Sequence, residues 1–307
     1  MIAMPRHTNL SELLIRQRMN ALTRSLPGAR RGDPGRLHQA RIATRRLREA
    51  LPLVMPGSRG RKLERTIRRF TRALGRVREL DVALETLGAL TASGDVPRAA
   101  IAALRRLLRQ ERQRLHAEMC TRVDRVDLHK LQRRAVAAAS KGHAKAARGR
   151  ARHSKRAEAV RLRTARRAVR LREAIENAAG LYLPDRLHGV RVAVKRLRYT
   201  TEMSRALGGS RGNARIRILK EAQDLLGHMH DHEVLSARVR ALQGSSKAPN
   251  LRISADLDRL VRHLETECRQ IHGRYVALRR KLLAVCDRAA ATAATASGAA
   301  AQRPSAA

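Results

Sequence analysis

The chain has 307 residues with 67 Lys or Arg against 26 Asp or Glu, and its formal net charge of +41 at pH 7 calls for an anionic partner to offset its self-repulsion. The candidate partners are nucleic acid, an acidic membrane surface and a chain of phosphates, and the excess of arginine over lysine favours phosphate oxygens, which the planar guanidinium group matches. No apolar run is long enough to span a membrane, and with no Trp, one Phe and three Tyr the chain has few rings on which bases could stack, so composition excludes a membrane-spanning protein and argues against a base-stacking reader of single strands.

The hydrophobic pattern predicts an all-α fold, because β-branched runs and Asn-Gly or Asp-Gly hairpin turns are missing. The predicted helices lie near 9–26, 34–55, 59–91, 97–123, 156–179, 184–207, 213–243 and 251–288. Pro and Gly separate them, as at Pro27-Gly28 and Pro56-Gly57. Four helices in each half predict two four-helix bundles.

The second and sixth of these predicted helices begin with nearly the same sequence. Residues 34–48 and 184–198 are identical at nine of fifteen positions, with a spacing of 150 residues, about half the chain. A recurrence of this density predicts that the chain contains two copies of one unit. Pro34 and Pro184 suit the first position of a helix, and Asp33 is a good N-cap before Pro34.

Each copy places a cationic strip opposite an apolar face. The strip of the first copy consists of His38, Arg41, Arg45 and Arg48, and that of the second of His188, Arg191, Lys195 and Arg198. At helical spacing each strip falls within an arc of about 80°. The alternative interpretation is an ordinary solvated face, but such faces usually mix signs, since like charges at i,i+4 destabilise a helix by about 0.2–0.5 kcal/mol per pair. The single sign and the recurrence favour a ligand-binding strip.

The helix after each copy adds cations and a related motif. Arg65 and Arg68 correspond to Arg217 and Lys220 at an offset of 152 residues. The segments Leu74 to Val82 and Leu226 to Val234 follow at the same offset. The duplication is therefore predicted to cover whole bundles.

One domain is predicted over residues 8–288, with a first half at about 8–128, a basic linker at about 129–155 and a second half at about 156–288. Residues 141–172 carry thirteen Lys or Arg and one acid, and small residues dominate them up to about 155. That composition predicts a mobile linker followed by a basic helix, and such tracts often act as non-specific polyanion arms. The Ala-rich stretch 289–307 is predicted to be disordered.

These motifs, taken together and in this order, resemble those of the CHAD family, the conserved histidine α-helical domain. The resemblance rests on a His-x-x-Arg-x-x-x-[Arg/Lys]-Arg-Leu-Arg helix at His38 to Arg48 and again, followed by a tyrosine, at His188 to Tyr199. It also rests on the segments Leu74 to Val82 and Lys220 to Gly227, and it spans roughly residues 8–288.

The resemblance implies two four-helix bundles around a basic central channel that binds inorganic polyphosphate and takes the protein to polyphosphate granules. The implied binding residues are His38, Arg41, Arg45, Arg48, His188, Arg191, Lys195 and Arg198, with Arg65, Arg68, Arg217 and Lys220 as second contributors. The chain departs from the family pattern at two positions. Glu79 stands where the family usually shows Asp, and His230 replaces the Arg expected before Asp231. Both departures are expected to alter supporting salt bridges more than the channel.

The sequence does not favour catalysis, and no catalytic residue or cofactor is predicted. It has no Walker-type loop, no nucleophile with a paired base, and no carboxylate cluster for the Mg²⁺ that phosphoryl transfer normally needs. The run His228, His230 and His232, with Asp231 and Glu233, suggests a metal site, but without a clear distant ligand no metal is predicted. An odd cysteine count, Cys120, Cys268 and Cys286, fits inert thiols in a reduced cytoplasmic protein.

The leading interpretation is a non-catalytic polyphosphate-binding protein of the cytoplasm, associated with polyphosphate granules. The first alternative is a nucleoid-type protein that binds DNA or RNA without reading sequence, since phosphate contacts are blind to bases. The second is an accessory that presents polyphosphate to a separate enzyme. No membrane partner is predicted.

Overall fold

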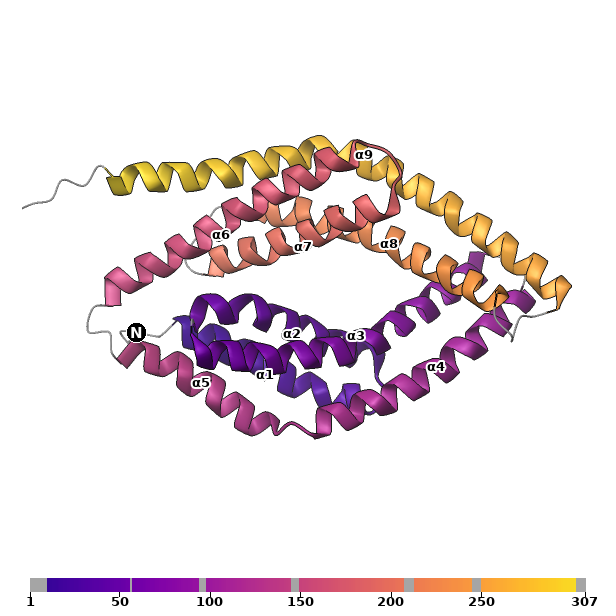
Figure 1. Cartoon of the computed structure of the whole chain (residues 1–307), viewed down its shortest axis with the longest axis horizontal. Coiled ribbons are helices and arrows are strands. Elements are labelled where there is room, and N and C mark those ends of the chain that lie inside the picture. The colour runs from indigo at the N-terminus through magenta and orange to yellow at the C-terminus, as the bar shows by residue number, and fades with distance from the viewer. Residues whose placement is uncertain are drawn as a thin grey trace, which may run out of the picture. The chain divides into compact units, whose positions relative to one another are not determined.

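A computed structural model describes residues 10–55, 57–93, 98–144, 149–206, 213–244 and 250–301, and within them the chain forms nine α-helices and no strand (Figure 1). The all-α prediction is confirmed. The helices are α1 (Leu10–Arg30), α2 (Pro34–Val54), α3 (Ser58–Ser93), α4 (Arg98–Asp124), α5 (Leu128–Ala144), α6 (Gly149–Ala178), α7 (Pro184–Ala206), α8 (Asn213–Gln243) and α9 (Leu251–Ala301). No helix in the described part of the chain is long and apolar enough to cross a membrane.

Both copies of the repeated segment form helices that begin at their proline, as predicted. At α2 the cap is Asp33, whose carboxylate accepts a hydrogen bond of 3.0 Å from the backbone N–H of Arg36. Each helix follows a glycine with positive φ, Gly32 at 88° and Gly180 at 77°. Glycine adopts this conformation without steric cost, so each turn sets where the next helix starts.

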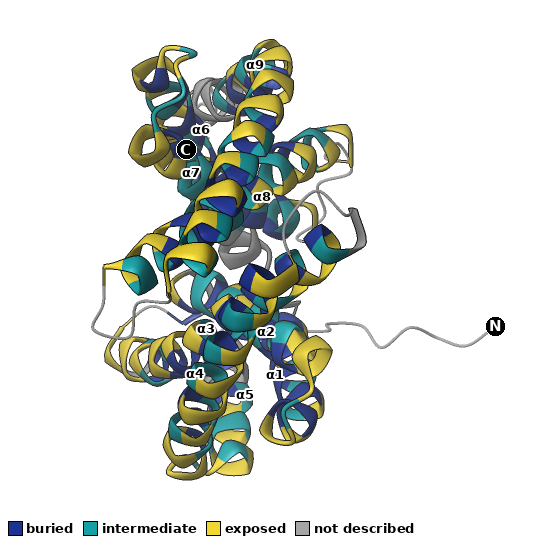
Figure 2. Cartoon of the chain, turned by 90° about the vertical axis from the view of Figure 1, so that its right-hand side faces the viewer, coloured by how far each residue is buried: buried dark blue, intermediate teal, exposed yellow. Residues whose placement is uncertain are grey.

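Contacts divide the chain into two compact units, and the first consists of residues 1–81 and 110–159. Its core is formed by one side of each helix, and the buried residues are the dark blue parts of the ribbon in Figure 2. Ile15, Met19 and Leu22 of α1 are completely buried, and so are Leu47 of α2 and Leu74 of α3. Apolar burial of this kind is the main force that holds the helices together.

The predicted linker at 129–155 is wrong over its first part, where the structure has helix α5. Asp127 caps this helix, accepting a hydrogen bond of 2.8 Å from the backbone N–H of Lys130. The helix packs on α1, where Gln132 donates to Asn20 (2.7 Å) and bonds to Thr23 (3.1 Å). Small residues such as Ala135, which is completely buried, bring the two helices close together. The first part of the predicted linker is therefore a packed helix, while residues 145–148 lie outside the described residues.

The second unit consists of residues 82–109 and 160–307, so α3 and α4 each pass from one unit into the other. Its core gathers apolar residues of α6, α7, α8 and α9 around Tyr275, which is completely buried. The predicted disorder from residue 289 is wrong up to Ala301, because α9 continues to that residue. Alanine has the highest helix propensity, which explains the extension. Residues 302–307 lie outside the described residues.

The predicted helix break at Pro27-Gly28 is also wrong, because α1 continues through both residues to Arg30. Gly28 has a packing role there. An added Cβ would lie 2.5 Å from Cγ and 2.8 Å from Cβ of Arg36, which belongs to the first turn of α2. The glycine therefore lets the start of α2 approach α1.

We expect Gly28→Ala to destabilise the protein by about 1–3 kcal/mol, because the new methyl group would overlap the base of the Arg36 side chain. Urea unfolding measures the change. The matched control is Gly88→Ala, at a helical glycine of α3 where an added Cβ meets nothing within 4 Å. That control should stabilise by roughly 0.5–1 kcal/mol through helix propensity alone. Equal effects of the two substitutions would contradict the packing role of Gly28.

Candidate functional site

The cationic strip of α2 lies opposite the core of the first unit. His38, Arg41, Arg45 and Arg48 are all partly exposed. On the other side of the helix, Ala40, Leu47 and Leu51 are completely buried. The α2 strip is therefore accessible to a ligand while its helix is fixed by the core beneath it.

Helix α3 brings a second set of cations to the α2 strip. The pKa of Arg48 is lowered, first by burial and then by the positive charges of Arg68 and Arg45, while the carboxylates of Glu49 and Glu64 partly offset this effect. Arg65 and Arg68 are exposed on α3, and Arg68 forms an ion pair of 2.9 Å with Glu64. Like charges from two helices thus lie close enough to oppose one another, and an anion bound there would relieve the repulsion.

The guanidinium group of Arg41 lies over Gly75 of α3, in the Leu74 to Val82 motif. Its Nε lies 3.6 Å from where a Cβ of Gly75 would be. The Arg41 side chain therefore lies beside the backbone of α3 at this motif. The equivalent glycine of the second unit, Gly227, has nothing within 4 Å of such a Cβ. The two strips therefore differ in detail at this position.

The strip of α7, in the second unit, is less uniformly exposed than the repeat predicts. His188 is exposed, and Arg191 and Arg198 are partly exposed, but Lys195 is buried, at 9% exposure. Arg217 and Lys220 of α8 are exposed. Lys195 therefore lies deeper than Arg45, its counterpart in the first copy.

His188 lies against a histidine that the resemblance marked only as a departure. The ring centroids of His188 and His230 are 4.8 Å apart. Burial, and then the charges of Arg191 and Lys195, lower the pKa of both, and that of His230 falls to about 4. A neutral imidazole can donate an N–H to a phosphate oxygen. Sequence reasoning did not include His230 in the binding set, because only the packing of α8 on α7 brings it to His188.

Acidic and polar side chains orient the arginines of the α7 strip. Arg191 lies 3.9 Å from a carboxylate oxygen of Asp231. Arg198 donates to Gln223 (3.0 Å) and to Glu202 (2.7 Å). Its guanidinium carbon also lies 4.9 Å from the centre of the Tyr199 ring. Gln223 belongs to the Lys220 to Gly227 motif. That motif therefore adds a cation, Lys220, beside the strip and also holds Arg198 of the strip in place through Gln223.

The turn before α2 is held by residues of α4 that the sequence did not single out. Arg112 donates to the Asp81 carboxylate (2.6 Å) and to the Gly32 carbonyl (2.7 Å). His116 Nε2 lies 3.0 Å from the carbonyl oxygen of Ala29. The only signal in the sequence was Asp81, the acid near the end of the Leu74 to Val82 motif.

The turn before α7 is held in a comparable way, with different residues. The Tyr182 hydroxyl donates to Glu233 (3.1 Å), the residue at the position of Asp81 in the second motif. Burial raises the pKa of Glu233, and the hydrogen bond from Tyr182 opposes this rise. His272 of α9 contacts the Tyr182 ring edge-on, at 5.5 Å between centroids.

The histidine run of α8 does not gather a metal-binding group. Within the described residues, no three His, Cys, Asp or Glu side chains are placed to hold a metal ion. His228 is exposed, while His230 and His232 are partly buried. Burial raises the pKa of all three cysteine thiols, to about 12 for Cys286, so they stay protonated and poorly nucleophilic.

His230 should make stability depend on pH. Its folded pKa of about 4 lies below the ordinary 6.5, so between these values the unfolded chain binds a proton that the folded chain does not. Stability should therefore fall as pH is lowered from about 6.5 to about 4. We expect His230→Gln to flatten this fall by about 1–2 kcal/mol, allowing for partial exposure. Urea unfolding at pH 7.5 and 4.5 measures it, with His228→Gln as the exposed control, and parallel curves for wild type and His230→Gln would contradict the prediction.

The chain matches the family model of the CHAD domain over residues 13–240, which extend from α1 to α8. It resembles the crystal structure of the CHAD domain from the plant Ricinus communis, with a TM-score of 0.66, 20% identity, and coverage of 92% of this chain and 94% of that chain. It also resembles PptA from Streptomyces chartreusis, with a TM-score of 0.63, 17% identity, and coverage of 89% and 98%. No curated protein matches it. Similarity at such low identity shows the shared fold, while the family match over most of the chain shows that this protein belongs to the CHAD family.

Proposed function

We propose that this protein binds inorganic polyphosphate, without catalysing a reaction, through the α2–α3 and α7–α8 cationic faces. The observation that carries the proposal is that Arg48 of α2, which is partly buried, lies near Arg45 and near Arg68 of α3, whose positive charges lower its pKa against the opposing charges of Glu49 and Glu64. Repulsion of this kind destabilises the free protein. A chain of phosphates would reverse it, because each phosphate places negative charge between neighbouring guanidinium groups.

The second cationic face supports the same ligand. His188 and His230 are kept neutral beside Arg191 and Lys195, so imidazole N–H groups lie next to full positive charges. That combination offers phosphate oxygens both hydrogen bonds and charge. As the family resemblance implies, we infer that the two faces line one channel and that a single phosphate chain contacts both.

The aromatic residues favour a phosphate chain over nucleic acid. Phe70, Tyr199 and Tyr275 are at most 8% exposed, and Tyr182 is partly buried with its hydroxyl bonded to Glu233. Proteins that bind single strands stack bases on exposed rings. With these rings committed to the interior, the cationic faces suit a ligand that has phosphates and no bases.

A binding role without catalysis fits the acids near the two faces. Glu64 pairs with Arg68, Glu202 with Arg198, and Asp231 lies near Arg191. These carboxylates orient arginines and are dispersed along the helices, whereas phosphoryl transfer normally gathers carboxylates around Mg²⁺. We place the protein in the cytoplasm at polyphosphate granules, where its ligand would concentrate it.

A competition titration tests the choice of ligand. Labelled long-chain polyphosphate bound to the full chain should be displaced by unlabelled polyphosphate at far lower phosphate concentration than by random duplex DNA or by RNA. The titration is run at physiological salt, because every contact with phosphate weakens as salt rises. Equal or stronger displacement by DNA or RNA would favour the nucleoid-type alternative instead.

Matched substitutions test whether both faces hold one ligand. Arg65 and Arg217 occupy equivalent positions of α3 and α8, and both are exposed, so Arg65→Ala and Arg217→Ala should leave folding intact. Each should flatten the slope of log K against log[salt] by about 0.7, the value for one phosphate contact on a single strand. The double variant should lose at least the sum of the two effects.

The control for these substitutions is Arg274→Ala, an exposed arginine of α9 outside both faces. It should leave the slope nearly unchanged. If Arg65→Ala weakens polyphosphate binding while Arg217→Ala behaves like the control, the two faces do not share one phosphate chain and the channel is wrong.

A further inference from the structure

A separate groove lies between α3, α4 and α5 of the first unit, with a volume of about 630 Å³. Six cationic side chains line it, two from each of three consecutive segments of the chain. They are Arg69 and Arg72 of α3, Arg122 near the end of α4 with Arg125 just after it, and Lys130 and Arg134 of α5. The only acid in the lining is Asp127.

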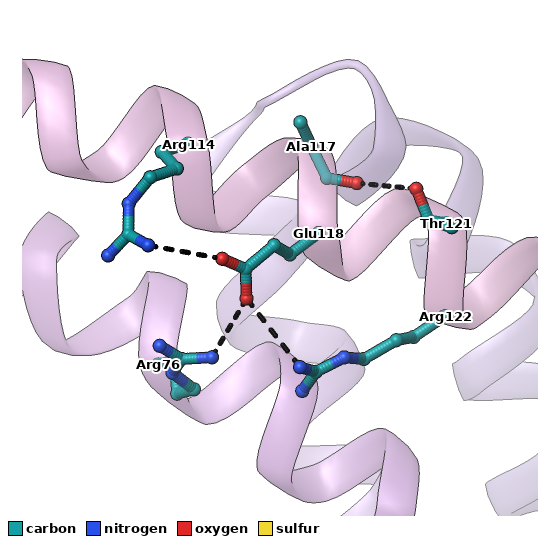
Figure 3. Close-up of polar contacts among 6 residues, drawn as sticks. All are labelled: Arg76, Arg114, Ala117, Glu118, Thr121 and Arg122. Carbon is teal, nitrogen blue, oxygen red and sulfur yellow. Dashed lines mark hydrogen bonds and ion pairs between the residues drawn. The ribbon is translucent and has the colours of Figure 1, made fainter.

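The acids in and around the groove are already engaged. The Asp127 carboxylate caps α5, and the backbone N–H of Lys130 that it accepts lowers its pKa. Glu118 of α4 binds three arginines at once, Arg76 (2.9 Å), Arg114 (3.4 Å) and Arg122 (3.6 Å), as Figure 3 shows. One groove cation, Arg122, is therefore held in place by a carboxylate that it shares. The positive charge of the groove exceeds what its neighbouring acids offset.

The groove borders the α2–α3 cationic face, because Arg72, which lines the groove, lies about 40° round α3 from Arg68, but most of its lining comes from elsewhere. Thr66, Arg69 and Ala73 line it from one flank of α3, spaced by three and four residues so that they share a face. Arg68, which contributes to the face shared with Arg48, lies about 100° round the helix from Arg69. No residue of α2 lines the groove.

The floor of the groove is apolar, which a purely inorganic phosphate chain would not use. Val126 and Leu131 are partly exposed and supply the accessible apolar surface, while Phe70 and Val123, at 3% exposure, add almost none. Ligand pockets of small molecules combine such an apolar lining with a few charged groups, at volumes of about 300–1,000 Å³. The groove has this size and this division between an apolar floor and a cationic rim.

We propose that the α3–α4–α5 groove binds an organic phosphate of about the size of a nucleoside triphosphate. Its phosphates would contact the rim arginines and Lys130, and its organic part would cover the apolar floor. Guanidinium groups suit this task because their planar N–H donors match phosphate oxygens. This site goes beyond the proposed binding of polyphosphate and would give the protein a second, smaller ligand.

Calorimetric titration of the full chain at physiological salt tests the proposal, with ATP and inorganic tripolyphosphate as the two probes. Both probes carry three phosphates, so the difference between their affinities measures the contribution of the organic part of ATP. We expect ATP to bind at least about tenfold more tightly than tripolyphosphate. Lys130→Ala should weaken ATP binding about tenfold, because it removes a rim charge while the backbone cap to Asp127 stays.

Two control variants separate this site from other cationic surfaces. Lys281→Ala removes the same charge from an exposed position of α9 and should leave ATP affinity unchanged. Arg65→Ala should weaken binding of long-chain polyphosphate but not of ATP. The groove would be rejected if ATP bound no better than tripolyphosphate, or if Lys130→Ala and Lys281→Ala had the same effect. Either result leaves the polyphosphate proposal standing, since that rests on the Arg65 and Arg217 variants.

Discussion

Repulsion among like charges is the constraint on which this structure depends. A formal charge of +41 on 307 residues opposes any compact state, yet the cations are gathered into strips that bring them closer together. The fold withstands this repulsion because each helix carries its cations on one side and its buried apolar residues on the other. Residues such as Leu47 and Leu74 are completely buried on one side, and their burial offsets the repulsion on the other.

The few acids are used to orient arginines, and not to neutralise the surface. Glu118 contacts three arginines, and Arg198 is held by Glu202 together with the neutral Gln223. The pairs of Glu118 involve exposed arginines, and exposed ion pairs contribute little to stability, about 0–1 kcal/mol each. Their value is that long, mobile side chains lose freedom before a ligand arrives, so less entropy is lost on binding. An excess of positive charge, held in place by these contacts, then remains on the surface.

Much of this arrangement could be predicted from the sequence, because it depends on local periodicity. The start of α2 at Pro34, the start of α7 at Pro184 and the two-sided character of α2 all follow from residues within one helix. Helix α5 could not be predicted, because small residues such as Ala135 indicate a packed helix only once it is known that α1 lies against them. The burial of Lys195 and the contact of His230 with His188 likewise depend on how neighbouring helices pack. The α3–α4–α5 groove depends on the path of the turn between α4 and α5, and the periodicity of the sequence does not predict the path of a turn.

The two turns that precede the cationic helices α2 and α7 are each held by an acid at the same position of the repeated motif. At the same motif position, Asp81 accepts from Arg112 whereas Glu233 accepts from Tyr182, so the acid is kept while its donor changes from a charged to a neutral group. In each case the bond secures a turn that contains a glycine with positive φ, Gly32 or Gly180. A displaced turn would rotate the helix that follows and move every cation of its strip together. The acid near the end of the motif is therefore placed to set the direction of a helix and with it the positions of the cations in the strip, and this explains why its partner can differ between the two halves while its position does not.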